Sequence, residues 1–313
     1  MRRRMTNRDS GFTLIELIIA LLLGTVILSA AITFLITHMR SLEGSDIREN
    51  VARNDRYIGA LLRRDLQMAG IDIKSNTSYG TIGVWPGGTG DTLIILYVPY
   101  NPEPSPIHDV DPTESQPSAG QGTCGTRCIE VLYDPSKPEE LAIGDMARLE
   151  VEGVRRLLLI DGFEVDGPEW EISWTDSDTL LHQPAGLVGP VQVKVPGTYV
   201  QKLAPIIFYL DAEERLMRAE SLNMDGSPNG IVVAYGVQEF DVSLIFADGD
   251  TLPKANPYDS DNSNDFDDIV GVKVIVTVRA ERTDLRVNNG VLVTKTSEWR
   301  ISPRNLRYEK NRV

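Results

Sequence analysis

Carboxylates gather in one short stretch of the chain, DSDNSNDFDD, which begins at Asp259. Alternating oxygen ligands in a loop suit Ca²⁺, which takes about six to eight oxygens at roughly 2.3 to 2.6 Å. Asp259, Asp261 and Asp265 match the first, third and seventh positions of an EF-hand loop. The glycine of the sixth position is Asn264, however, and the glutamate of the twelfth is Val270. A solvated acidic loop without a cofactor is therefore the favoured interpretation, and a calcium site at the three aspartates is the alternative.

The cysteines and histidines form no recognisable catalytic pattern. Cys124 and Cys128 are the two cysteines of the chain, and they can close a small local disulfide outside the cytoplasm, two free thiols being the alternative. They offer only half of the ligands of a tetrahedral metal site. His38, His108 and His182 stand in no HExxH arrangement, and neither GxSxG nor GxxxxGK[ST] occurs. We therefore expect no catalytic residues and a protein that is not an enzyme.

One carboxylate stands at the edge of an apolar segment. Glu16 is followed by the 23 residues Leu17 to Met39, which include no Asp, Glu, Lys or Arg. At about 1.5 Å per residue, this run is long enough to cross a bilayer core of roughly 30 Å. An unpaired carboxylate in apolar surroundings costs several kcal/mol, and pairing with a cation offsets part of that cost. Glu16 is therefore expected to need a cationic partner.

The charge distribution predicts how the apolar segment lies in a membrane. Arg2, Arg3, Arg4 and Arg8 precede the segment, and positive flanks stay on the cytoplasmic side. Residues after Arg40 should then lie outside the cytoplasm. The net charge of −14 argues against nucleic-acid binding. Because an ordinary secretory signal has an apolar region of only about 7 to 15 residues, we expect a retained anchor or a segment processed on its cytoplasmic side.

The apolar segment leads into an amphipathic pattern. Apolar side chains recur there at helical spacing with arginines and acids between them: Ile47, Val51, Ile58, Leu61, Leu62 and Leu66. The pattern predicts a helix from Phe12 to Ala69 with Gly70 as its C-terminal stop, and Gly44 marks a position for a bend or short break. Since the arginines alternate with acids, ion pairing along the helix is favoured over nucleic-acid binding.

Beyond Gly70, short β-branched and aromatic runs separated by Gly, Pro and Asp predict a mainly antiparallel sheet. The expected strands are residues 92–98, 128–134, 148–160, 169–174, 205–210, 231–246, 269–281 and 294–302. The Pro-rich residues 99–123 predict an extended, mobile surface excursion, and the acidic residues 247–268 a second one. The fold class is therefore α+β, with the amphipathic half of the helix covering one face of the sheet.

The opening stretch SGFTLIELIIALLLG resembles the class III signal of type IV pilins and type II secretion pseudopilins. The resemblance implies a leader, Met1 to Gly11, that a prepilin peptidase removes by cutting after Gly11, and a mature chain that begins at methylated Phe12. Glu16 is then the fifth mature residue. In the family, a glutamate at this place pairs with the α-amino group of a neighbouring subunit and registers it in the filament.

The resemblance extends more weakly along the chain. The segments RNDRYIGALLRRDLQMAGI, YGVQEFDVSLIF and WRISPRNLRYE are similar to those of PilW-like minor pilins, whereas the Pro-rich and acidic excursions depart from them. The implied fold is type IV pilin-like. It comprises the leader (1–11), a membrane-spanning and assembly half of the helix (12–39), an amphipathic half (40–70) and an extracytoplasmic β-rich domain (71–313).

The resemblance implies a minor pilin that primes or caps filament assembly. Its expected partners are other minor pilins, the major pilin, the prepilin peptidase and the inner-membrane assembly platform. We expect a single pass through the inner membrane, with a cytoplasmic N-terminus and a periplasmic C-terminal domain. A GspJ-like pseudopilin of a type II secretion system is the alternative function, and a membrane-anchored periplasmic enzyme or binding module is the second.

Overall fold

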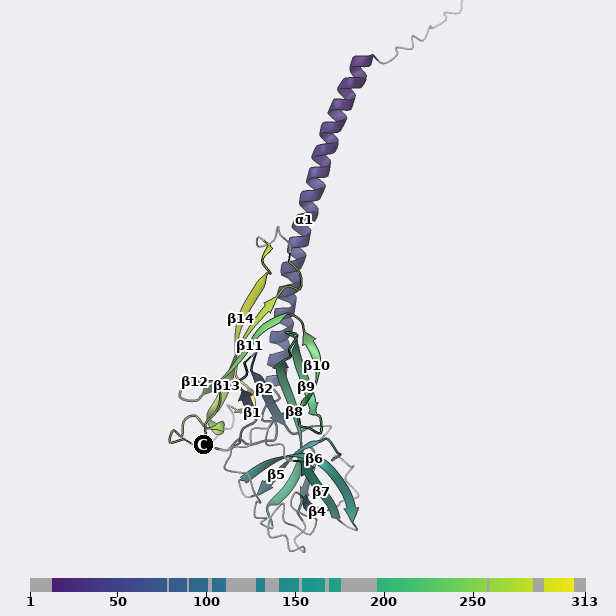
Figure 1. Ribbon diagram of the computed structural model, residues 1–313. Helices are drawn as coiled ribbons and strands as arrows, with labels where there is room; N and C mark the ends of the chain where they lie inside the picture. The colour runs from purple at the N-terminus through teal and green to yellow at the C-terminus, as the bar shows by residue number, and fades with distance from the viewer. Residues whose placement is uncertain are drawn as a thin grey trace, which may run out of the picture. The chain divides into compact units, whose positions relative to one another are not determined.

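A computed structural model of the chain describes residues 13–77, 79–88, 90–100, 103–110, 128–132, 141–151, 154–166, 169–175, 196–257, 259–283 and 290–306. The chain forms two compact units. The first comprises Met1–Asn50 with Arg282–Val293, and the second Val51–Glu281 with Thr294–Val313. The first unit contains the N-terminal part of the long helix α1, and the second contains the rest of α1 and the strands (Figure 1).

Helix α1 runs from Leu14 to Leu66, 53 residues and about 80 Å long. It is unbroken at Gly44, where the sequence marked a position for a bend or break. The helix ends three residues before the predicted Ala69. Gly70 adopts a positive φ of 74°, which glycine reaches without strain, and its N–H donates to the carbonyl of Leu96 in the neighbouring strand. Gly70 therefore redirects the chain from the helix into the sheet.

The amphipathic pattern of α1 is confirmed. The six apolar residues predicted for one face are all buried, and Ile58, Leu62 and Leu66 are entirely so. Burying a side chain of this size contributes about 1.5 to 3 kcal/mol. Gly59 allows α1 to lie close to the sheet, because a Cβ there would lie 2.9 Å from Cε2 of Trp299.

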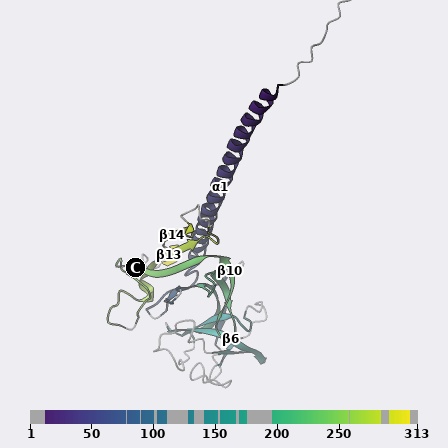
Figure 2. The ribbon, with the colours of Figure 1, turned by 45° about the horizontal axis from the view of Figure 1, so that its top comes forward.

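Two ion pairs connect this part of α1 to strands. Asp65 and Arg218 of β9 (Leu216–Leu222) lie 2.5 Å apart, with side chains 2% and 10% exposed. Asp55, also buried, pairs with Lys295 of β14 (Thr294–Ile301). Because both members of the Asp65–Arg218 pair are buried, removing one of them should cost about 3 to 5 kcal/mol, since the other charge stays buried and uncompensated. Strands β13 and β14 lie beside this part of α1 in both views (Figures 1 and 2).

Among the residues that the structure describes, the larger sheet has ten strands, and every pairing in it is antiparallel. Its strands, besides β9, are β1 (Ile82–Trp85), β2 (Thr92–Tyr97), β3 (Ile107–Asp109), β4 (Cys128–Leu132), β5 (Met146–Val151), β6 (Val154–Asp166), β7 (Glu169–Thr175), β8 (Thr198–Leu210) and β10 (Pro228–Ala234). The order is β1-β2-β8-β5-β6-β7-β4, while β3 and the β9–β10 hairpin also join β8.

Six of these strands close into a ring. Strand β3 pairs with β8, and an antiparallel bridge between Val110 and Val131 connects the end of β3 to β4. The strands β3, β8, β5, β6, β7 and β4 therefore enclose a core that includes Trp170, Leu149 and Val200. His108 of β3 is also buried and contacts the Trp170 ring, with ring centroids 5.0 Å apart. The predicted surface excursion is therefore wrong for residues 105–110.

The smaller sheet has the order β12-β11-β13-β14. Its further strands are β11 (Val237–Phe246), β12 (Thr251–Leu252) and β13 (Ile269–Arg279), and the short 3-10 helix η1 (Phe266–Asp268) precedes β13. Alternate residues of β11 and β13 are buried, among them Val242 and the residue opposite it, Val274. Asp91, just before β2, joins the two sheets by accepting from the N–H of Val242 and donating its own N–H to the carbonyl of Phe240. A long N-terminal helix with antiparallel sheets confirms the predicted α+β class.

Candidate functional site

The N-terminus of α1 holds Glu16 in a capping box. The Glu16 carboxylate accepts from the Thr13 N–H at 3.0 Å and from the Thr13 hydroxyl at 2.9 Å, while the Glu16 N–H donates to that hydroxyl at 3.4 Å. This reciprocal arrangement satisfies N–H groups that a helix start leaves without partners. Both of these donors are neutral, so within the described part of the chain the negative charge of the carboxylate has no cationic partner. The signal was present in the sequence as Thr-x-x-Glu, three residues apart, and our sequence analysis missed it.

The surface of α1 from Leu14 to Met39 is apolar and exposed. The most apolar 18-residue window of α1 has a mean hydropathy of 2.6, and none of its residues is buried. By length and composition this helix can cross a membrane. In water, such a continuous apolar surface would be unfavourable, because burying apolar area is worth about 25 cal/mol per Å². The segment therefore requires lipid or other apolar helices around it.

Three threonine hydroxyls on this part of α1 are satisfied within the helix. Thr25 donates to the carbonyl of Leu22, Thr33 to that of Ser29, and Thr37 to that of Thr33, each at 2.8 Å. These three threonines therefore present no unsatisfied hydroxyl donor to apolar surroundings. Small side chains spaced four residues apart also let another helix approach closely, as they do between membrane helices.

Several predicted residues lie outside the described part of the chain. Gly11 and Phe12, the expected cleavage and methylation positions, precede Thr13, where the description begins. Cys124 also lies outside it, whereas Cys128 is buried at the start of β4. The cleavage site and the pairing of Cys124 with Cys128 thus stay predictions.

The histidines have separate surroundings. His38 lies on exposed α1 and stacks on Phe34, with ring centroids 5.9 Å apart, whereas His108 is enclosed in the ring of strands beside Trp170. His182 lies outside the described residues. Neither described histidine stands in a nucleophile and base arrangement that we recognise.

The acidic segment before β13 divides into two groups. Asp259 accepts from the side-chain amides of Asn256 and Asn264 and from the N–H of Asp261. Asp261 in turn accepts from the N–H and hydroxyl of Ser263. These carboxylates organise the loop, and the amide of Asn264 holds the pKa of Asp259 below its usual value. The predicted set Asp259, Asp261 and Asp265 is thus not the one whose oxygens lie together.

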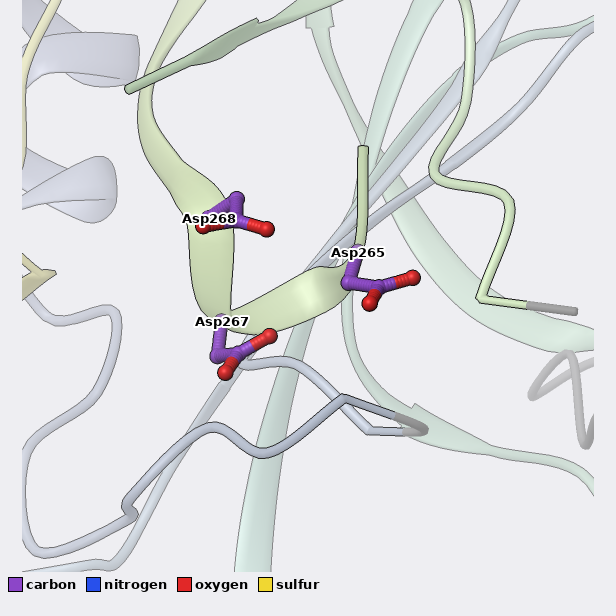
Figure 3. A group of neighbouring side chains, drawn as sticks. All are labelled: Asp265, Asp267 and Asp268. Carbon is purple, nitrogen blue, oxygen red and sulfur yellow. The ribbon is translucent and has the colours of Figure 1, made fainter. Parts of the chain in front are cut away.

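Asp265 instead gathers with Asp267 and Asp268 of η1. One carboxylate oxygen from each of the three lies within 4.8 Å of the others. Figure 3 shows the three side chains. Asp265 is buried, whereas Asp267 is exposed and Asp268 half-buried. Burial raises the pKa of the Asp265 carboxyl, and the negative charges of Asp267 and Asp268 raise it further. The interpretation of a wholly solvated loop is therefore wrong at Asp265.

Comparison with known proteins bears on the N-terminal segment. Residues 6–32 match the family model of the prokaryotic N-terminal methylation motif. No curated protein matches the chain. Among solved structures, the type IV-like pilin TTHA1219 from Thermus thermophilus is similar, with 8% sequence identity and a TM-score of 0.35 over 82% of this chain and 97% of that chain. That likeness is too slight to support an argument, so the motif at residues 6–32 carries what can be said about the class of protein.

Proposed function

We propose that the chain is a minor pilin of a type IV pilus, similar to PilW-like proteins, that primes or caps the filament without catalysing a reaction. One observation carries this proposal: the methylation motif of residues 6–32 continues without interruption into α1, whose apolar surface is exposed. A simple membrane anchor needs the apolar helix but not the motif. The β-rich second unit then serves as the part that distinguishes this subunit from its neighbours.

Maturation prepares the helix for assembly. The prepilin peptidase cuts after Gly11, and Phe12 becomes the methylated first residue with a cationic α-amino group. The chain is held in the inner membrane by α1 with its N-terminus cytoplasmic and its sheets periplasmic. Its partners are the other minor pilins, the major pilin and the inner-membrane assembly platform.

Glu16 acts as the registration group. Among the residues that the structure describes, its carboxylate accepts from Thr13 alone, whose donors carry no charge. The α-amino cation of a neighbouring subunit would form a charge-assisted hydrogen bond, which is roughly twice as strong as a neutral one. Pairing with this cation instead of with Thr13 would neutralise the charge of the carboxylate as the apolar helix surfaces leave lipid and pack together. A helix displaced by one turn, about 5.4 Å, could not form this bond.

Deleting the gene for this chain tests which filament it serves. We expect surface pili to fall to background while type II secretion of exoproteins continues, with both measured in the same strain. Complementation with the intact gene should restore the pili and serves as the control. Normal piliation with a loss of secretion would contradict the proposal and would favour the GspJ-like pseudopilin.

A further inference from the structure

The second half of α1 turns two acids inward and its arginines outward. Asp55 and Asp65 are 4% and 2% exposed. They pair with Lys295 and Arg218 of the strands. The arginines of the same stretch all lie on the exposed side of the helix: Arg48, Arg53, Arg56, Arg63 and Arg64. Because the two buried acids serve the strands, the outward face of α1 is left basic.

Six exposed residues share this outward face, because they recur at intervals of three and four residues. We call them the arginine patch: Arg53, Arg56, Tyr57, Ala60, Arg63 and Arg64. At about 1.5 Å per residue the patch is roughly 16 Å long. Tyr57 is 52% exposed at its centre. Within the described part of the chain, Arg56 and Arg63 form no ion pair, so their charges are available to a partner.

The arginine patch lies too far along α1 to bind lipid headgroups. Arg53 comes 14 residues after Met39, where the apolar run ends, and is therefore about 21 Å farther along the helix. The headgroup layer adds only about 5 to 7 Å to each side of the hydrocarbon core. The net charge of −14 repels nucleic acid at long range. An acidic protein surface is the partner that these charges fit.

The chain has such a surface of its own in the acidic residues 247–268. Five of its acids are exposed, against the single lysine Lys254: Asp248, Asp250, Asp259, Asp261 and Asp267. The N–H of Ala247 donates to the carbonyl of Asp268, which brings the two ends of this segment together. Burial raises the pKa of Asp265, and the charges of the last three exposed acids raise it further, so these acids lie close to it. The exposed acids therefore form one negative surface.

We propose that the arginine patch of one copy binds the acidic residues 247–268 of a second copy of this chain. Arginine and carboxylate groups can form two parallel hydrogen bonds, which are stronger than neutral ones. Tyr57 adds an aromatic side chain, a type that is enriched with arginine at protein interfaces. The two surfaces differ, so the contact is head-to-tail and can repeat from copy to copy. This contact goes beyond the proposed function, because it joins copies of the same subunit.

Sedimentation velocity of the full chain in a neutral detergent tests the contact. We expect the average mass to rise with protein concentration in about 50 mM sodium chloride and to fall to that of a monomer in about 1 M, where the Debye length is about 3 Å. Arg56→Glu combined with Arg63→Glu should weaken association by about tenfold or more, because repulsion replaces attraction. The melting temperature should not change, since both side chains are exposed.

A matched control changes the net charge equally outside the patch. Arg282→Glu combined with Arg300→Glu alters side chains that are 65% and 69% exposed, and this variant should associate as the unaltered chain does. Their surface ion pairs contribute at most about 1 kcal/mol each, so the fold should be preserved.

Exchanging charges between two variants tests for direct contact. Asp250→Lys combined with Asp267→Lys, both at exposed positions, should also weaken self-association. Mixing this variant with the Arg56→Glu, Arg63→Glu variant should restore association, because each surface then meets one of opposite charge. The proposal is overturned if the unaltered chain stays monomeric at low salt, if the arginine variant associates normally, or if the mixture does not associate. Salt-dependent binding of labelled single-stranded DNA that the arginine variant loses would overturn it in favour of nucleic acid.

Discussion

Glu16→Ala should leave the chain cleaved and methylated but remove it from filaments. The peptidase acts before Glu16, so maturation should proceed, whereas the neighbour's α-amino group would lose the carboxylate that registers the subunit. The measurement is the amount of this chain in sheared filament fractions relative to the amount in membranes. Glu43→Ala is a matched control, because Glu43 is an exposed glutamate on the same helix beyond the apolar segment, and we expect it to be incorporated normally.

Glu16→Gln distinguishes registration by charge from capping of the helix. Glutamine can still serve the capping box with Thr13, so the helix start should be preserved. Losing a cap costs about 0.5 to 2 kcal/mol, too little to unfold a helix of 53 residues. If charge is what matters, Glu16→Gln should be excluded from filaments as Glu16→Ala is. Incorporation of either variant at the level of the unaltered chain would remove Glu16 from the mechanism.

Gly11→Val should block maturation altogether. A branched side chain directly before the expected cleavage bond would crowd the peptidase, and a chain that keeps its leader cannot present Phe12 as a free N-terminus. Intact-mass measurement should then find the chain still carrying Met1 to Gly11. Gly24→Ala, within α1, is the control, because a Cβ at Gly24 meets nothing within 4 Å. Continued cutting of Gly11→Val at the same bond would show that the cleavage position is wrong.

The helix was predictable because its pattern repeats. The apolar residues from Ile47 to Leu66 recur at a spacing that fits a helix and not a strand, and all six are buried. The C-terminal end of α1 was harder to predict, because contacts with other parts of the fold fix the last turn of a helix. Here the N–H of Gly70 bonds to Leu96, a residue that no local pattern identifies as its neighbour.

The strands were partly predictable. Two long apolar runs, 148–160 and 231–246, were each expected as one strand, but they form the pairs β5 and β6, and β10 and β11. Gly236, with a φ of 67°, turns the chain within the second run, and a glycine in a strand pattern was the available signal. Strand β9 was missed because its sequence, LMRAESL, has strong helix formers, and pairing with β8 and β10 overrides that preference.

The closure of six strands into a ring could not be predicted from the sequence. Strand β3 has three residues within a Pro-rich segment, and only its pairing with β8 and the bridge from Val110 to Val131 make it part of a core. Such long-range pairings leave no mark in local composition. His108 was therefore expected in a surface loop, although it is buried against Trp170.

Glu16 and the acidic cluster before β13 also differed in how far the sequence could predict them. Glu16 could be identified because the motif that contains it is one continuous stretch of sequence, from Gly11 to the apolar run. For the acidic cluster, the sequence showed that carboxylates gather in one stretch but not which of them lie together in the fold. Matching it to EF-hand positions selected Asp259 and Asp261, whose oxygens are used by the loop itself, and passed over Asp267 and Asp268. Asp265 is buried, and the ring of the next residue, Phe266, lies against Gly80, which local sequence does not reveal.

The mass of the N-terminal peptide, measured on the chain extracted from its native membrane, tests the central claim most directly. Our account predicts a chain that begins at Phe12, with one added methyl group on its α-amino nitrogen and with Met1 to Gly11 removed. The same measurement in cells without a prepilin peptidase should find the leader retained. A native chain that begins at Met1 or Met5 would contradict the account, because α1 would then be an ordinary anchor and Glu16 would have no neighbouring α-amino group to bind.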